Sequence, residues 1–257
     1  MKEAPEAHAG SVRPGSHPVT VTDRGLPHWL RPVADAASTM RPHQLSRFLP
    51  PRDGGRESAV LVLFGESGTR GGAEDAGGDG ADGIGGRGGA PELLLMERAS
   101  SLRSHAGQPS FPGGALDPED GDPGSDGPLR AALREAEEET GLDPSGVQVF
   151  GRLPRVYIPV SDFVVTPVLG WWREPSPVAP VDPAETARVF TVPVADLVDP
   201  ANRATVVHPS GFRGPCFLVG DTLVWGFTAG IIDRVLHYAG WERPWDTDRR
   251  VPLDWSA

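Results

Sequence analysis

The sequence predicts an α/β domain, because segments typical of buried β-strands occur together with two helical patterns. The segment AVLVLF at 59–64 is short, apolar and β-branched, and ELLLMER at 92–98 has the same character. Further strands are expected at 147–154, 163–172, 187–194 and 216–226, the last with a hairpin turn at Gly220–Asp221. Helices are expected at 128–142, which Pro128 begins and Gly141 ends, and at 228–240.

Composition predicts the domain organisation. Residues 1–25 are polar and rich in Pro, Gly and His, so they are expected to form a flexible tail. Residues 26–52 carry apolar side chains between prolines and predict a short helical or irregular segment on the surface of a domain at 26–245. Residues 65–90 are Gly-rich and of low complexity, which predicts a long connection inside the hairpin of the first two strands. Residues 246–257 are expected to be a C-terminal tail.

The charge balance excludes some classes of partner. The formal net charge is −11, which argues against electrostatically driven nucleic-acid binding. A polyanionic substrate would need a bound cation or a local basic patch. The single cysteine, Cys216, permits no intrachain disulfide and is expected to be buried, and one cysteine fits a reducing cytoplasm. The N-terminus lacks the apolar core of a signal peptide, and no apolar run is long enough for a membrane span.

Four glutamates lie close together in REAEEETGL, residues 134–142, at the end of the first predicted helix. Glu135, Glu138 and Glu139 have the spacing i, i+3, i+4, so they share one face, where like charges repel. The helix C-terminus also disfavours anions. A solvated surface face is the ordinary interpretation of such a run. A hard cation such as Mg²⁺, which takes carboxylate oxygens, would instead relieve both penalties.

With the upstream FPGGALDPED (111–120), these residues resemble the Nudix box, G-x5-E-x7-R-E-U-x-E-E-x-G-U, where U is a bulky aliphatic residue. Gly114 and Asp120 stand at the first G and E, and Ala136 stands at a U position that is usually larger. Two further departures are Asp in place of Glu at 120 and the extra residues of GDPGSDGP, which lengthen the spacing to Arg134. They leave the role of Asp120 open.

The resemblance covers roughly residues 55–240 and implies a Nudix fold, with a mixed β-sheet between α-helices, and a divalent Mg²⁺ or Mn²⁺ cofactor. It implies that Glu135, Glu138 and Glu139, with Gly114 beside them, form the metal site and that one glutamate orients or deprotonates water. It also implies that Arg134 orients Glu135 through a charge-assisted hydrogen bond.

A second motif, LLLMERASSLRSHAGQPSFPGG (93–114), resembles the sequence that precedes the box in coenzyme A pyrophosphatases, with Met96 where Thr is usual. The resemblance implies substrate contacts by Arg98, Arg103, His105 and Phe111. Arginine forks suit phosphate oxygens, but Arg98 could instead end a strand and pair with a carboxylate of the acidic helix. His105 could equally cap a turn. Glu185 is a candidate late metal ligand or base, against the alternative of a solvated loop residue.

These resemblances imply a cytoplasmic, metal-dependent hydrolase that cleaves the pyrophosphate of coenzyme A or acyl-CoA. The products would be 3′,5′-ADP and (acyl-)4′-phosphopantetheine, and a homodimer is possible. Three alternatives remain: a Nudix hydrolase of another substrate such as ADP-ribose, NADH or a nucleoside triphosphate; a non-catalytic Nudix nucleotide-binding regulator; and a structural cation-binding domain.

Overall fold

A mixed sheet forms the centre of the molecule in the computed structural model, which describes residues 19–52, 54–68, 89–101, 107–209 and 211–253. Its strands are β1 (Arg56–Glu66), β2 (Pro91–Arg98), β3 (Pro109–Ser110), β4 (Gly113–Ala115), β5 (Val147–Arg152), β6 (Val156–Ile158), β7 (Phe163–Trp172) and β8 (Thr186–Pro193). The main path runs β3-β2-β1-β7-β5, with β4 on β1, β6 on β7 and β8 on β2.

Strand β1 organises this sheet because it pairs on both edges. One edge runs parallel to β7, with Ala59 opposite Thr166. The other edge is shared: β4 pairs antiparallel near Ala59, and β2 pairs antiparallel near Phe64. The β1–β2 pairing confirms the predicted hairpin of these two strands. The Gly-rich connection lies mostly outside the described residues.

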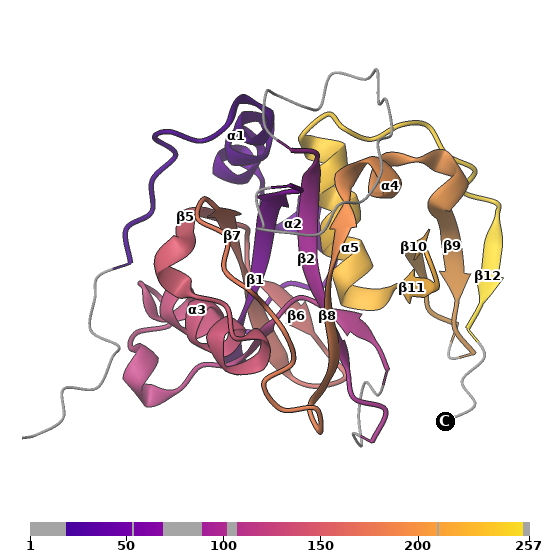
Figure 1. Cartoon of the computed structure of the whole chain (residues 1–257). Helices are drawn as coiled ribbons and strands as arrows, with labels where there is room; N and C mark the ends of the chain where they lie inside the picture. Colours follow the sequence, from indigo (N-terminus) through magenta and orange to yellow (C-terminus); the bar gives the residue numbers. More distant parts are fainter. Residues whose placement is uncertain (1–18, 53, 69–88, 102–106, 210, 254–257) are drawn as a thin grey trace, which may run out of the picture.

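Helices cover both faces of the sheet, as the predicted sandwich requires (Figure 1). The helices are α1 (Arg31–Thr39), α2 (Pro42–Leu45), α3 (Gly127–Thr140), α4 (Val194–Val198) and α5 (Gly226–Tyr238), with 3-10 turns at His28–Leu30, Pro118–Asp120, Pro144–Gly146 and Pro200–Asn202. Alternation along β1 separates two cores, because successive side chains of a strand point to opposite faces. Leu61 and Leu63 pack in a cluster with Leu129 of α3, whereas Val62 and Phe64 pack in a larger cluster with Leu236 of α5.

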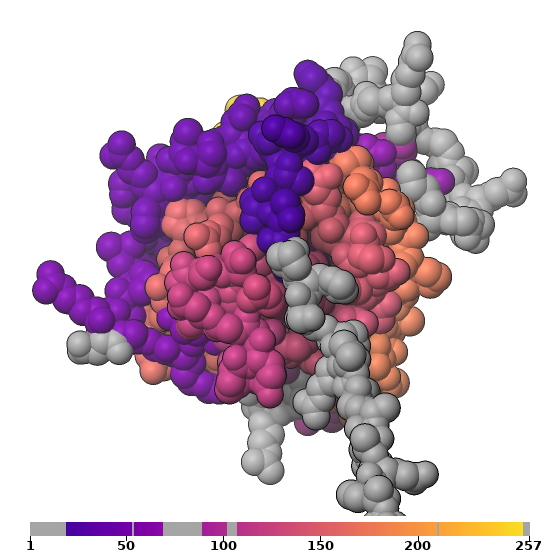
Figure 2. All heavy atoms as spheres, turned by 90° about the vertical axis from the view of Figure 1, so that its left-hand side faces the viewer, coloured from indigo at the N-terminus to yellow at the C-terminus, as the bar shows by residue number. Residues whose placement is uncertain are grey.

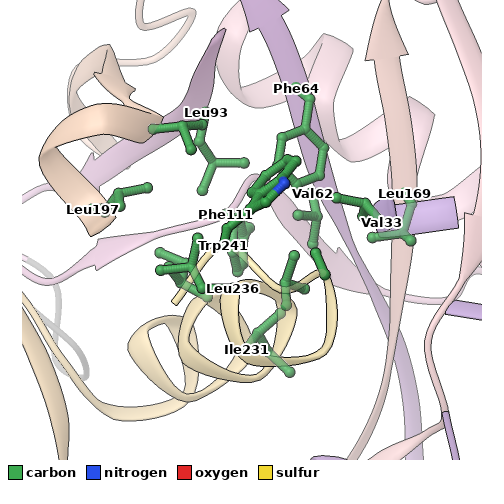
Figure 3. Packing of buried hydrophobic residues seen from close by; sticks show 14 of the residues in the cluster. Val33, Val62, Phe64, Leu93, Phe111, Leu169, Leu197, Ile231, Leu236 and Trp241 are labelled. Carbon is green, nitrogen blue, oxygen red and sulfur yellow. The ribbon is translucent and has the colours of Figure 1, made fainter. Parts of the chain in front are cut away.

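The larger core lies between the sheet, α5 and the N-terminal helical segment. Figure 3 shows Phe64 and Leu93 of the sheet and Ile231 and Leu236 of α5 around the ring of Trp241. Trp29 closes this core from the N-terminal side, with its ring centroid 6.2 Å from that of Trp241. The 26–52 segment is therefore helical where its apolar side chains reach the core.

A second sheet, of order β11-β10-β9-β12, contains β9 (Arg203–Val207), β10 (Arg213–Val219), β11 (Thr222–Val224) and β12 (Arg250–Pro252). The β10–β11 pairing confirms the predicted hairpin at Gly220–Asp221. Strand β12 lies in the predicted C-terminal tail and pairs in parallel with β9, so ordered structure continues beyond residue 245. The fully buried Arg203 holds this region through ion pairs to Asp233 and Glu242.

The predicted N-terminal tail is only partly described. Residues 1–18 lie outside the described residues. Further along, the amide of Thr22 donates to the carbonyl of Val149 in β5 at 3.0 Å, and Gln148 donates to the carbonyls of Thr22 and Arg24. This part of the predicted tail is therefore held against the edge of the sheet. Cys216 is buried, as expected from the sequence.

Candidate active site

Two glycines bring β4 and α3 into close contact. A Cβ at Gly113, whose φ is +155°, would lie 2.3 Å from the carbonyl oxygen of Ala59, so only glycine fits there. A Cβ at Gly114 would lie 2.5 Å from the carboxyl carbon of Glu135. The Gly–Gly pair of the FPGG sequence therefore lets the carboxylates of α3 approach the backbone of β4.

Glu139 lies deepest in the acidic face. Its Oε2 accepts a hydrogen bond from the amide of Gly113 at 2.9 Å, and its Oε1 lies 3.9 Å from Nη1 of Arg98. Burial raises the pKa of Glu139 to about 7, because the charged form loses hydration, and the charges of Glu135 and Glu185 raise it further. The Gly113 amide and Arg98 oppose this shift. The site thus holds a carboxylate whose ionisation a nearby cation would favour.

Glu135 and Glu138 meet at the guanidinium of Arg134. Nη1 of Arg134 donates to Oε1 of Glu135 and to Oε2 of Glu138, each at 3.0 Å. Burial raises the pKa of Glu135, and the charge and hydrogen bond of Arg134 counteract that rise. Glu138 is the most open of the three, with 58% of its side chain exposed. The hydrogen bond between Arg134 and Glu135 that the resemblance implies is therefore present.

Asp120 accepts hydrogen bonds from the other two nitrogens of the same guanidinium. Nη2 of Arg134 donates to Oδ2 of Asp120 at 2.9 Å, and Nε donates to Oδ1 at 3.2 Å. Asp120 is buried and its Oδ2 also accepts from the amide of Asp117. The hydrogen bond to Asp120 is the largest influence raising the pKa of Arg134 above its ordinary value. Asp120 therefore positions Arg134, which is the role that the sequence left open.

The donor set suits a hard divalent cation. Three carboxylates supply the oxygen ligands that Mg²⁺ and Mn²⁺ prefer. Across the described residues, however, no group of three or more His, Cys, Asp or Glu is already arranged to hold a metal ion. Arg134 hydrogen-bonds one oxygen of Glu135 and one of Glu138, which leaves the second oxygen of each carboxylate outside this contact. The residues fit a metal by their chemistry.

The residues predicted to bind substrate lie in different surroundings in the structure. Arg98 ends β2 and forms the ion pair with Glu139, so the alternative of a pair with the acidic helix is observed. Phe111 is 2% exposed and packs in the larger core, which corrects the predicted substrate contact: its ring has no surface to offer a ligand. Arg103 and His105 lie outside the described residues.

Glu185 is exposed at the start of β8, next to the end of β2. Its carbonyl accepts from the amide of Ala99 at 2.8 Å, and its charge contributes to the raised pKa of Glu139. The fold therefore brings Glu185 toward the acidic face across a long sequence separation. Sequence reasoning missed the carboxylate of Asp117 and the carbonyl of Ala115, which also contact Arg134. The only signal was their place in the FPGGALDPED segment.

Comparison with known proteins decides the family. A family model described as the NUDIX domain matches residues 84–210. A relative named as an uncharacterized Nudix hydrolase, NudL, from Cronobacter sakazakii is 40% identical over 157 residues, 60% of this chain and 78% of the relative. The chain belongs to the Nudix hydrolase family.

Two further proteins are similar to this chain. NudL of Escherichia coli K12, also named as uncharacterized, is 40% identical over 149 residues, 55% of this chain and 72% of the relative. Among solved structures, the Nudix hydrolase RenU of M. smegmatis matches with a TM-score of 0.46 and 18% identity over 77% of this chain and 98% of that one. The described fold is α/β, with a mixed sheet between helices. No helix of the described residues is long and apolar enough to cross a membrane.

Proposed function

We propose that this Nudix hydrolase cleaves the pyrophosphate bond of coenzyme A or acyl-CoA, giving 3′,5′-ADP and (acyl-)4′-phosphopantetheine. The observation that carries the proposal is the place of Arg98. This arginine belongs to the 93–114 motif that resembles coenzyme A pyrophosphatases, and its guanidinium lies 3.9 Å from Glu139 of the acidic face. The motif and the box thus meet at one site.

Glu135, Glu138 and Glu139, with the carbonyl of Gly114, would hold Mg²⁺ or Mn²⁺. When bound, such a cation neutralises phosphate oxygens and lowers the pKa of water. Asp120 holds Arg134, and Arg134 in turn orients Glu135 and Glu138. This chain of contacts supplies the fixed geometry that phosphoryl chemistry needs, since positioning contributes much of its rate.

Arg98 would bind a phosphate oxygen of the diphosphate. Its side chain is 32% exposed, so the guanidinium can contact a ligand while it lies beside Glu139. Arg103 and His105 are proposed to add contacts from the adjoining segment of the motif. Glu185 is proposed as a base or additional ligand, because its charge already acts on Glu139.

The test is incubation of the full-length protein with coenzyme A and Mg²⁺, with products identified by mass spectrometry. Release of 3′,5′-ADP that requires metal and is lost in Glu138→Gln supports the proposal. Glu137→Gln is the matched control, because Glu137 is also exposed on α3 but makes no contact with Arg134 in the described structure. Cleavage of ADP-ribose, NADH or a nucleoside triphosphate in place of coenzyme A would overturn the substrate and retain the Nudix chemistry.

A further inference from the structure

The ladder between β2 and β8 changes register beside Arg98. Glu97 lies opposite Arg188 in regular register. The next residue, Arg98, lies opposite Thr186, so Ala187 is an additional residue of β8. Such a bulge bends its strand and redirects neighbouring side chains, and bulges are frequent next to active sites. The irregularity therefore falls at the residue that is proposed to bind the diphosphate.

Glu97 and Arg98 point to opposite faces of the sheet, because side chains alternate along a strand. Leu94 packs in the cluster under α3, whereas Leu95 packs in the larger cluster around α5. Arg98 therefore shares the face of α3, where its guanidinium lies 3.9 Å from Glu139. Glu97 lies on the face of α5, so contacts of its side chain hold the backbone of β2 directly behind Arg98.

Arg188 joins β2, β8 and the second sheet on the face of α5. Its Nε donates to Oε2 of Glu97 at 2.7 Å. Its Nη2 donates to Oδ1 of Asp221 at 3.3 Å and to the hydroxyl of the buried Thr222, both in the β10–β11 hairpin. The guanidinium also lies over the ring of Phe190, 4.6 Å from its centroid. A planar guanidinium with several partners is held in one orientation, so Arg188 fixes the last regular pair of the ladder.

The start of β8 holds the residue that follows Arg98. The amide of Ala99 donates to the carbonyl of Glu185 at 2.8 Å. The segment that leads into β8 also reaches the acidic helix, where the amide of Val181 donates to the carbonyl of Glu139 at 3.3 Å. Figure 2 shows this segment, in orange tones, on the same face of the molecule as α3, in magenta. Strand β8 and the segment before it therefore contact the chain on both sides of the pair of Arg98 and Glu139.

We infer that Arg188 is a positioning residue for the proposed reaction: it holds Glu97 to the second sheet, fixes the bulge and thereby sets Arg98 against the acidic face. The inference rests on the proposed contact of Arg98 with the substrate diphosphate. Arg188 lies on the opposite face of the sheet from the carboxylates of α3, so it acts only through Arg98. Such positioning matters, because a displacement of about 1 Å caused by a distant substitution can cost about a hundredfold in rate.

The first test is steady-state kinetics of the full-length protein with coenzyme A and Mg²⁺. Arg188→Met keeps an apolar side chain but removes the guanidinium. KM should rise about tenfold while kcat changes little, because Arg98 binds substrate and transition state alike. A purely structural defect would instead lower kcat through loss of folded protein and leave KM unchanged.

A double-mutant cycle shows whether Arg188 acts through Arg98. In an Arg98→Ala background, Arg188→Met should raise KM no further, because residues that act through one another are not additive. Arg173→Met is the control, since Arg173 forms a more exposed ion pair with Glu174 just after β7. This control should leave both KM and kcat unchanged.

Crystal structures of the metal-free protein give a readout that does not depend on turnover. In Arg188→Met, the guanidinium of Arg98 should move away from Glu139 relative to the unmodified protein. Glu97→Ala should have the same effects on KM and on Arg98. It retains the contacts of Arg188 with the second sheet, so it keeps the inference testable if Arg188→Met fails to fold.

Failure of the inference and failure of the proposed function have different signs. If coenzyme A is not cleaved, KM is measured with whichever of ADP-ribose, NADH or a nucleoside triphosphate is cleaved, and the crystal structures decide if none is. Displacement of Arg98 without cleavage of coenzyme A would refute the substrate and retain the inference. The inference would be overturned by an unchanged KM in both Arg188→Met and Glu97→Ala, by an equal rise of KM in the Arg98→Ala background, or by Arg98 remaining against Glu139 in both variants.

Discussion

Arg134 and Asp120 form the contact that joins the loop before α3 to the acidic face. Two nitrogens of the guanidinium reach the two oxygens of this buried carboxylate, at 2.9 and 3.2 Å. The remaining nitrogen of Arg134 contacts Glu135 and Glu138. Asp120 therefore acts on the glutamates through the arginine, although it lies fourteen positions before Arg134 in the chain.

Substituting Asp120 should destabilise the fold as well as the site. Asp120→Ala leaves Arg134 without its main partner, and loss of one member of a partly buried pair should lower the free energy of unfolding by about 2–4 kcal/mol. Urea denaturation measures this change. Asp126→Asn is the control, because Asp126 lies 3.8 Å from Arg130 in a more exposed pair and should change stability by less than about 0.5 kcal/mol. Equal effects of the two substitutions would contradict the role of Asp120.

The two glycines of β4 should respond differently to alanine. Gly113→Ala places a Cβ against the backbone of Ala59 and should strongly lower the melting temperature. Gly114→Ala meets only the flexible end of Glu135, so the fold should persist while Glu135 is displaced. Mn²⁺ affinity, measured by calorimetry, should then fall about 10–100-fold.

A third glycine provides the control for this pair. Gly230→Ala in α5 has nothing within 4 Å of the added Cβ and should stabilise the helix by about 0.5–1 kcal/mol. If Gly114→Ala bound Mn²⁺ like the unmodified protein, the contact between Gly114 and Glu135 would have no part in the metal site.

The raised pKa of Glu139 predicts a pH-dependent stability of the metal-free protein. Its pKa is about 7 when folded, against an ordinary value of 4.5. Below pH 4.5 both folded and unfolded states are protonated, and between 4.5 and 7 the unfolded state alone loses its proton. Stability should therefore fall as pH rises through this window and then level off above pH 7.

Glu139→Gln removes this titration. In the presence of EDTA the variant should gain stability over the unmodified protein at pH 8, on the order of 2–3 kcal/mol, and much less at pH 5. Urea denaturation at the two pH values measures both differences, with Glu137→Gln as the exposed control. A gain of the same size at both pH values would show that the charge of Glu139 is not its source.

Asp162 has a backbone conformation that favours glycine. Its φ is +58°, which glycine adopts without strain. The hydroxyl of Tyr157 donates to Oδ1 of Asp162 at 2.9 Å, which offsets the strain. By calorimetry, Asp162→Ala should lower the melting temperature and Asp162→Gly should not. The reverse order would refute this account.

Local sequence patterns determined much of the fold. The apolar run at 163–172 is β7, and the turn at Gly220–Asp221 separates β10 from β11. The spacing of the glutamates on one helical turn and the glycines at 113 and 114 indicated the acidic face. These features depend on residues close together in the chain, where periodicity, turn chemistry and helix geometry act directly.

Only the tertiary structure decided which distant groups meet. The pairing of Asp120 with Arg134, of Arg98 with Glu139 and of β12 with β9 depends on closing long loops, and no local pattern encodes their register. The burial of Phe111 depends likewise on how the sheet packs against its neighbours. The sequence by itself determined the chemical character of the site, and packing determined which carboxylate each arginine holds.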